Sequence, residues 1–299
     1  MVAGRNHCNN NDIRPYGTGE TMGIARTISL VLVLLTATAA ASASDSKFTD
    51  LKGNPKVRSA SAIVLDADGN MIYGKDVDTV RPIASITKLM TAMVVLDADL
   101  DLNEKITITK ADRDLIRLTG SRLEYGATLP RRELILLALM SSENRAATAL
   151  GRNYPGGMDN FIAHMNSKAR GLGMSNSRFA DPAGLRAENV STASDLARML
   201  NAADAYPLIT QSTTTTRKEV RPYSRRGPLT YGNTNRLLKN KSWDIELSKT
   251  GYINEAGRCL VMQANIEGED VSIVLLNSFG KLTPFGDSNR LRKWMLTNS

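Results

Sequence analysis

The sequence predicts a protein of the mixed α/β (α+β) class, with an antiparallel sheet built from both ends of the chain and a helical region inserted between them. Two hairpin patterns predict the sheet, because residues 61–76 and 258–279 each contain two short apolar runs around a turn with glycine. Apolar residues at helical spacing predict the inserted region. The helical patterns cover residues 85–98, 131–151, 158–172 and 192–203, and an amphipathic helix over 288–296 closes the chain.

The first 43 residues predict an export signal that is not part of the fold. Arg26 precedes a long apolar run, and small residues follow it up to Ala43, which is typical of a cleavable signal peptide. The apolar run is too short for a comfortable membrane span. Residues 1–21 are polar, so we expect Met22 to be the true start, the alternative being Met1 with a long polar leader. We expect an N-terminal extension and signal peptide over 1–43 and a single domain over 44–299.

Cysteine and histidine are too few for several classes of site. Residues 44–299 contain one cysteine, Cys259, and one histidine, His164. No disulfide can form within this part, and a structural zinc site is nearly excluded because it needs several such ligands. Cys259 lies in a strand-like run and is expected to be a small core residue. No later stretch is apolar enough to span a membrane, so we expect no transmembrane anchor.

The chain is basic, with a formal net charge of +8. Residues 1–43 hold three arginines against two acidic residues, which leaves about +7 for the rest. A basic exported protein suits an anionic surface, such as the cell wall or lipid headgroups. Nucleic acid is a poorer partner, because export removes the opportunity to meet it. The densest basic stretch, residues 217–226, is expected to be a solvated loop, with docking on a polyanion as the alternative.

Lys88 is the first residue to suggest chemistry. It stands at the start of a helix that is apolar from Leu89 to Leu96 except for Thr91, one turn after Ser85. Residues at i and i+3 share a helix face, and burial lowers the pKa of a lysine. A neutral amine beside a serine hydroxyl can take its proton and activate it as a nucleophile. The alternative is a lysine that reaches the surface from the first turn.

Two further motifs favour the catalytic interpretation. Ser142-Glu143-Asn144 is the only Ser-x-Asn in the chain, and Lys249-Thr250-Gly251 is also unique. Each alone has an ordinary structural explanation, as a helix end or a strand end. Together with Ser85-x-x-Lys88, and in this order, they form the triplet of penicillin-binding proteins and serine β-lactamases.

The chain resembles the D-alanyl-D-alanine carboxypeptidase/endopeptidase family of low-molecular-mass penicillin-binding proteins. The resemblance runs over residues 58 to 296 and is carried by segments that include "RPIASITKLMTAMVVLDA", "LLALMSSENRAA", "RFADPAGL", "NTNRLL" and "SKTGYINEAGRCLVM". It implies a serine β-lactamase/DD-peptidase-like fold, so that residues 44–299 would be one catalytic domain. Departures from the family pattern are small: Ser248 stands where threonine is frequent, and residues 213–228 are more basic and looser than expected.

The resemblance implies a role for each catalytic residue. Ser85 would attack the carbonyl of a D-Ala-D-amino acid bond, and Lys88 would be its general base. Ser142 would relay a proton toward the leaving amine. Asn144 would hold Lys88 and the substrate amide.

The resemblance also implies the substrate-binding residues. Lys249 and Thr250 would bind the substrate carboxylate, and Gly251 would let the substrate backbone lie against the strand. The backbone N–H groups of Ser85 and Tyr252 would form the oxyanion hole, where the loss of one donor typically costs ~10²–10³ in rate. No metal or other cofactor is expected, because the serine and lysine chemistry is self-contained.

The expected activity is a periplasmic D,D-endopeptidase that cleaves D-Ala-diaminopimelate cross-links in peptidoglycan peptides. The alternatives are a D-alanyl-D-alanine carboxypeptidase that trims pentapeptides, and a β-lactam or muropeptide sensor without turnover. The Glu-x-x-Leu-Asn motif of class A β-lactamases is missing from the sequence, and Glu188 has the wrong neighbours to replace it. We therefore expect β-lactams to acylate Ser85 as slowly released covalent inhibitors.

Overall fold

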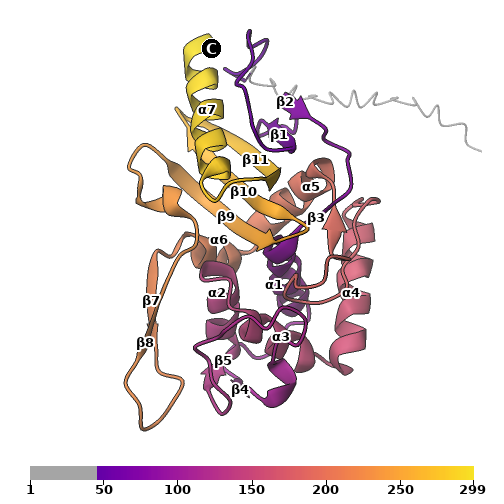
Figure 1. Cartoon of the computed structure of the whole chain (residues 1–299), viewed down its shortest axis with the longest axis vertical. Coiled ribbons are helices and arrows are strands. Elements are labelled where there is room, and N and C mark those ends of the chain that lie inside the picture. Colours follow the sequence, from indigo (N-terminus) through magenta and orange to yellow (C-terminus); the bar gives the residue numbers. More distant parts are fainter. Residues whose placement is uncertain (1–45) are drawn as a thin grey trace, which may run out of the picture. The chain divides into compact units, whose positions relative to one another are not determined.

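One five-stranded antiparallel sheet organises the computed structural model, which describes residues 46–299 (Figure 1). The strand order is β2-β1-β11-β10-β9. The strands are β1 (Ser61–Leu65), β2 (Met71–Lys75), β9 (Asp244–Ile253), β10 (Gly257–Ile266) and β11 (Glu269–Ser278). Strand β1 pairs with β11, so that Ser61 lies opposite Leu276. The prediction of a sheet built from both ends of the chain is confirmed, as are its two hairpins. The predicted signal peptide over 1–43 lies outside the described residues.

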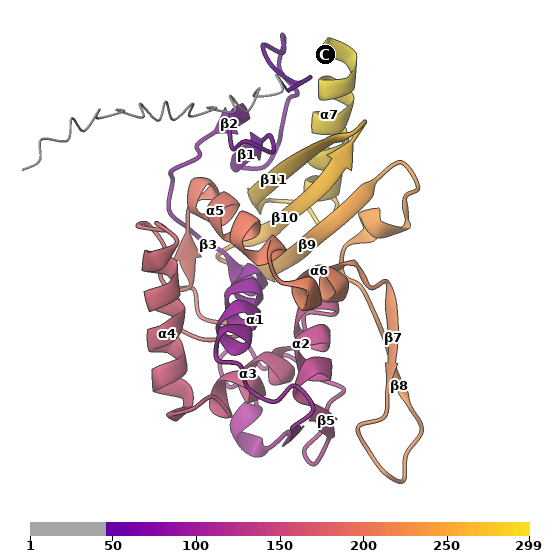
Figure 2. The same cartoon turned by 180° about the vertical axis from the view of Figure 1, so that it is seen from behind.

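Alternation along the strands gives the sheet two apolar faces. On β1, Ile63 belongs to the core shared with the helical region, whereas Val64 belongs to a second core under α7 (Thr283–Asn298). On β11, Val274 and Leu275 divide in the same way. Figures 1 and 2 show α7 on one face of the sheet and α5 and α6 on the other. Because both faces are buried, the strands read as continuous apolar runs.

Six helices make up the inserted region. They are α1 (Thr87–Asp97), α2 (Arg131–Met140), α3 (Asn144–Arg152), α4 (Gly157–Gly171), α5 (Ala193–Asp204) and α6 (Pro207–Thr214). Helix α1 lies at the centre, and every residue from Thr87 to Val95 is buried. This burial explains why α1 is apolar on nearly all sides.

The helical pattern over 131–151 forms two helices rather than one. Ser142, between α2 and α3, has a φ of 61°, and this left-handed conformation cannot continue a right-handed helix. Helix α6 was not expected from the sequence, because its run of threonines has low helix propensity. It begins with Pro207 in its first turn and buries Ile209 against the core.

The remaining elements are short. Three antiparallel pairs join β3 (Arg81–Pro82) with β6 (Val190–Ser191), β4 (Lys105–Thr107) with β5 (Thr128–Pro130), and β7 (Arg217–Val220) with β8 (Leu229–Gly232). Three 3₁₀ turns are η1 (Ala84–Ile86), η2 (Lys110–Asp112) and η3 (Arg236–Lys239). The basic stretch 217–226 begins as strand β7 and continues as a loop, so the expectation of a loop throughout is wrong for its first four residues. In residues 46–299, no helix has the length and apolarity needed to span a membrane.

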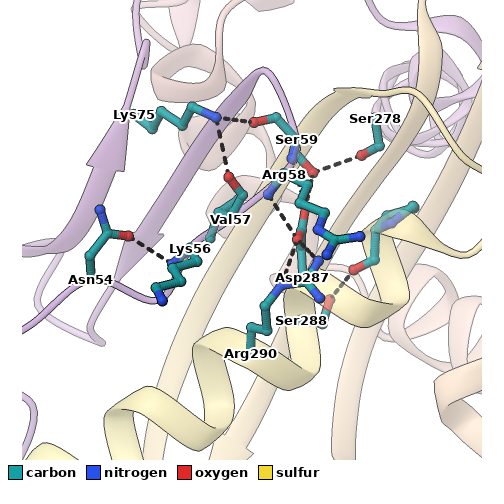
Figure 3. A network of polar contacts seen from close by, with 11 residues as sticks. Asn54, Lys56, Val57, Arg58, Ser59, Lys75, Ser278, Asp287, Ser288 and Arg290 are labelled. Atoms are coloured by element: carbon teal, nitrogen blue, oxygen red, sulfur yellow. Dashed lines mark hydrogen bonds and ion pairs between the residues drawn. The ribbon is translucent and has the colours of Figure 1, made fainter.

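A buried carboxylate ties the segment before β1 to helix α7 (Figure 3). Asp287 has a fully buried side chain, and it accepts hydrogen bonds from the backbone N–H groups of Arg58 and Ser59 at 3.0 and 2.7 Å. The Ser59 hydroxyl donates to the same carboxylate at 2.6 Å and also contacts the hydroxyl of Ser278. Arg290, one turn further along α7, forms an ion pair with Asp287. These bonds join the start of β1, the end of β11 and α7.

Candidate active site

Ser85 lies in the 3₁₀ turn η1, which leads directly into α1. The residue before it, Ala84, is fully buried and has a φ of 49°, a conformation that non-glycine residues rarely adopt. Such strained backbone costs of order 1–3 kcal/mol and persists only where the surroundings hold it in place, which is often the case at functional sites. The turn directs the Ser85 side chain toward Lys88.

Lys88 is fully buried, which excludes the alternative that its side chain reaches the surface. Its Nζ donates to Ser85 Oγ at 2.7 Å, to Asn144 Oδ1 at 2.8 Å and to the carbonyl oxygen of Ala183 at 2.6 Å. Burial lowers the pKa of Lys88 from its ordinary value to about 7. The lysine therefore holds a neutral fraction near pH 7, one hydrogen bond from the serine hydroxyl.

Ser142 and Asn144 flank the break between α2 and α3. Asn144 is the first residue of α3, and its side chain spans the space between Lys88 and the hydroxyl of Thr119, to which it donates at 2.9 Å. The left-handed conformation of Ser142 turns its hydroxyl toward Lys249, whose Nζ donates to it at 3.1 Å. The helix break thus presents both polar side chains to the same place.

Lys249, Thr250 and Gly251 lie on β9, one of the two edge strands of the sheet. Lys249 is 1% exposed, and burial together with the charge of Lys88 lowers its pKa well below the ordinary value. The Thr250 hydroxyl donates to that of Thr234 at 2.7 Å.

Gly251 packs against the 3₁₀ turn that carries the serine. A Cβ at this position would lie 2.8 Å from the carbonyl oxygen of Ile83 and 3.2 Å from the backbone nitrogen of Ser85. Only glycine lets the strand approach the turn so closely. Tyr252 follows at the rim, and this residue is 48% exposed.

All eight residues singled out in the sequence are therefore neighbours. A cavity of about 290 Å³ is lined by Ser85, Ser142, Asn144, Thr250, Gly251 and Tyr252, together with Thr234 and others. A second cavity, of about 250 Å³, opens beside it and shares Ser85, Asn144 and Tyr252. Lys88 and Lys249 lie behind the surface of these cavities, and their ammonium groups contact the two serine hydroxyls. The eight residues come from three separate segments of the chain, 85–88, 142–144 and 249–252.

The loop that begins at Asp181 supports Lys88, although it contains none of the three catalytic motifs. The carboxylate of Asp181 accepts hydrogen bonds from the backbone N–H groups of Ala183, Gly184 and Arg186, each at 2.7 Å. This arrangement aims the Ala183 carbonyl at Lys88. The sequence signal was present, since an aspartate followed by Pro-Ala-Gly is typical of a turn held by its own carboxylate.

A second supporting loop lies on the other side of Asn144. Asp114 accepts hydrogen bonds from the backbone of Ile116, Arg117 and Thr119 and from the Thr119 hydroxyl. Burial alone would raise the pKa of Asp114, but these hydrogen bonds lower it below its usual value. Thr119 is thereby fixed where it receives the amide of Asn144. No motif in the sequence pointed to this pair.

The described residues offer no metal site. Within residues 46–299, no three side chains of His, Cys, Asp or Glu are grouped closely enough to hold a metal ion. His164 is exposed on α4, where its Nδ1 contacts the carbonyl oxygen of Asn160. Cys259 is buried, as expected of a small core residue, and burial raises the pKa of its thiol to about 11.

Comparison with known proteins agrees with this geometry. Residues 49–280 match the model of the peptidase S11 family, the D-alanyl-D-alanine carboxypeptidases. The chain belongs to this family. Among its relatives, the D-alanyl-D-alanine endopeptidase of Pseudomonas aeruginosa is 49% identical over 243 residues, which are 81% of this chain and 78% of that protein. The endopeptidase of that name from Escherichia coli K12 is 47% identical over 245 residues, 81% of this chain and 79% of that protein.

Solved structures of related proteins share the fold. The DD-transpeptidase of Streptomyces K15 superposes with a TM-score of 0.76 at 28% sequence identity, and the match covers 82% of this chain and all of that one. This S11 peptidase therefore has the DD-transpeptidase fold, and the predicted fold and family are confirmed.

Proposed function

We propose that this S11 peptidase is a serine D,D-endopeptidase that cleaves D-Ala-diaminopimelate cross-links in peptidoglycan and is inhibited by penicillin. The observation that carries the proposal is the 2.7 Å contact between Ser85 Oγ and the buried amine of Lys88. Acyl transfer requires a nucleophile with a general base within hydrogen-bond reach, and the base works best when its pKa lies near the working pH. The two relatives described above are both named as D-alanyl-D-alanine endopeptidases, which favours the endopeptidase over the carboxypeptidase.

Ser85 and Lys88 carry the first step. Lys88, in its neutral form, takes the proton of the Ser85 hydroxyl while Oγ attacks the carbonyl carbon of the D-alanyl residue. The backbone N–H groups of Ser85 and Tyr252 stabilise the negative charge that develops on the carbonyl oxygen. The tight packing of Gly251 against Ser85 supports this assignment, because it brings the two segments together.

Collapse of the tetrahedral intermediate breaks the carbon–nitrogen bond. The amine leaves with a proton that Lys88 gives up through the Ser142 hydroxyl, and Lys249 keeps that hydroxyl oriented. A water molecule then attacks the acyl-enzyme while Lys88 accepts its proton. Lys88 returns the proton to Ser85 Oγ as the ester bond breaks, which releases the acid product and restores the serine. Asn144 holds Lys88 in place throughout, through its 2.8 Å hydrogen bond.

The substrate lies along the edge strand β9. Its backbone adds to the exposed edge over Gly251, and the carboxylate next to the cleaved bond binds at Thr250 and Lys249. Penicillin enters in the same way, since it carries a carboxylate beside its reactive amide. The acyl-enzyme that it forms is slow to hydrolyse.

We also propose that the protein acts in the periplasm, after removal of residues 1–43 as a signal peptide. The apolar run after Arg26 supports export. The positive charge of the remaining chain, and the exposed arginines of the β7–β8 hairpin, would favour association with an anionic wall or membrane surface.

A muropeptide digest tests the activity. The purified protein is mixed with cross-linked dimers and free pentapeptide monomers, with and without penicillin, and the products are read by mass spectrometry. We expect dimers to become monomers and penicillin to block the change. The Ser85→Ala variant is the matched control, and it should neither cleave dimers nor label with penicillin.

Three other outcomes of these experiments would contradict the proposal. If only pentapeptides lose their terminal alanine, the protein is a carboxypeptidase and the proposal is wrong. If neither substrate changes while penicillin still attaches to Ser85, the protein is a sensor. Full labelling of Ser85→Ala would overturn the assignment of the nucleophile.

A further inference from the structure

The larger cavity beside Ser85 has an unusual charge. Three cationic side chains line it, Arg236, Arg258 and Lys281, and its lining contains no aspartate or glutamate. None of the three forms an ion pair with a carboxylate within residues 46–299. Elsewhere on the molecule, arginines such as Arg117 and Arg152 do have acidic partners. Unpaired positive charge in a concave site attracts an anionic ligand.

The side chain of Arg258 is restrained by stacking on Tyr252. It lies on β10 opposite Tyr252, and its guanidinium group stacks on the Tyr252 ring, 3.6 Å from the ring centroid. Stacking restrains the side chain but leaves the edge of the guanidinium group, with its N–H donors, free. Arg236, the first residue of η3, lines the same cavity, as does Thr234 two residues before it.

The carboxylate next to the cleaved bond is not expected to bind Arg236 and Arg258. In the proposed function, the carboxylate next to the cleaved bond binds at Thr250 and Lys249. A leaving D-alanine carries that carboxylate and no other. A leaving cross-linked peptide carries at least one more, at the end of its own stem.

We propose that Arg236 and Arg258 form a subsite for a second carboxylate on the leaving peptide, and so select cross-links over D-alanine ends. The inference rests on the proposed function. It concerns the leaving group, which is a peptide in the endopeptidase reaction and D-alanine in the carboxypeptidase reaction. Guanidinium groups suit this task, because their paired N–H donors match the two oxygens of a carboxylate. Arg236 and Arg258 line the same cavity as Thr250, where the first carboxylate is proposed to bind.

Matched substrates test the subsite. Three peptides share one acyl-D-alanine half: the first releases meso-diaminopimelate with both carboxylates free, the second the same residue with its distal carboxylate converted to a carboxamide, and the third D-alanine. Because the cavity is open to solvent, we expect the diacid to be cleaved with a kcat/KM about tenfold above the amide, less than a fully buried charge pair would give. The third peptide should be cleaved more slowly than the diacid by a similar factor.

Variants assign the preference to the two arginines. Arg236→Gln and Arg258→Gln should each lower the ratio of diacid to amide, and the double variant should bring it close to one. Lys239→Gln removes one positive charge from the same short turn, outside the cavity, and should keep the wild-type ratio. Thermal unfolding checks that each variant is folded.

Two results would overturn the subsite: equal cleavage of diacid and amide by the wild type, or an unchanged ratio in the double variant. Failure of the proposed function would look different, because none of the three peptides would be cleaved. The subsite would then be tested by calorimetry with free meso-diaminopimelate peptide and its monoamide. Equal affinity for the two ligands would exclude the subsite, and a preference for the diacid that the double variant loses would support it.

Discussion

Lys88 combines complete burial with three acceptor oxygens around its ammonium group. Burial alone would lower its pKa further, but three carboxylates raise it again, in decreasing order Asp181, Glu143 and Asp114. Two of these, Asp181 and Asp114, also hold the loops that position Ala183 and Thr119. The same carboxylates therefore shape the site and keep the pKa of its base near neutrality.

The pH dependence of acylation follows from this balance. Lys88 acts as a base only when neutral, and its pKa is about 7, so the rate of penicillin labelling should rise with pH and level off above about pH 8. We expect labelling at pH 6 to be about tenfold slower than at pH 8, measured with a fluorescent penicillin. Lys88→Arg should label at neither pH, because arginine stays protonated. Equal rates at both pH values in the wild type would exclude Lys88 as the base.

At the scale of elements, the site depends on loops that press against the start of α1. Gly184 has a φ of 75°, and a Cβ there would lie 1.9 Å from the carbonyl oxygen of Ala84. The loop after Asp181 therefore packs against the strained turn η1 through Gly184, and strand β9 packs against the same turn through Gly251. The nucleophile is clamped between two backbone segments rather than by side chains.

Gly184→Ala should test this clamp. The new Cβ clashes with backbone and adds strain at positive φ, so we expect a loss of about 2–4 kcal/mol in the free energy of unfolding and slower penicillin labelling. Gly173→Ala is the matched control, since its φ is 70° but no atom lies within 4 Å of the new Cβ. It should lose only about 1–2 kcal/mol and label normally. Equal losses in urea unfolding would mean that the clash is relieved and the clamp is unimportant.

The sequence predicted the elements better than the loops. The hairpins and the central helix could be read from periodicity, and Ser85, Lys88, Ser142 and Lys249 from their spacing. The break at Ser142 could not, because a helical pattern of apolar residues continues across it. Asp114 and Thr119 were missed for a similar reason: their importance comes from long-range contacts with Asn144, which no local pattern encodes.

At the scale of the whole molecule, Asp287 joins segments that are far apart in the chain. Burial alone would raise its pKa, but hydrogen bonds from Arg58, Ser59 and Arg290 lower it below the usual value. The unfolded chain therefore binds a proton more readily than the folded one, and the stabilisation is present above about pH 4 and lost as the pH falls below it. Figure 3 shows the backbone N–H groups of Arg58 and Ser59 and the Ser59 hydroxyl, which all donate hydrogen bonds to this carboxylate.

Asp287→Ala should be strongly destabilising. It leaves the charge of Arg290 unpaired and several buried donors without an acceptor, so we expect a loss of about 3–5 kcal/mol in the free energy of unfolding. Asp68→Ala, at an exposed position of the β1–β2 turn, should change it by less than about 0.5 kcal/mol. Denaturant titration at pH 7 compares the two. A loss at Asp287 as small as that at Asp68 would show that solvent replaces the network.

The pairing of Ser61 with Leu276 also governs how the molecule assembles. Contacts between residues so far apart in the chain raise the contact order, and folding slows as contact order rises. The central pair of the sheet cannot close until β11 has been synthesised, and Lys249 cannot reach Ser142 before β9 exists. The chain therefore has no complete active site until the strands β9 and β11 have been synthesised.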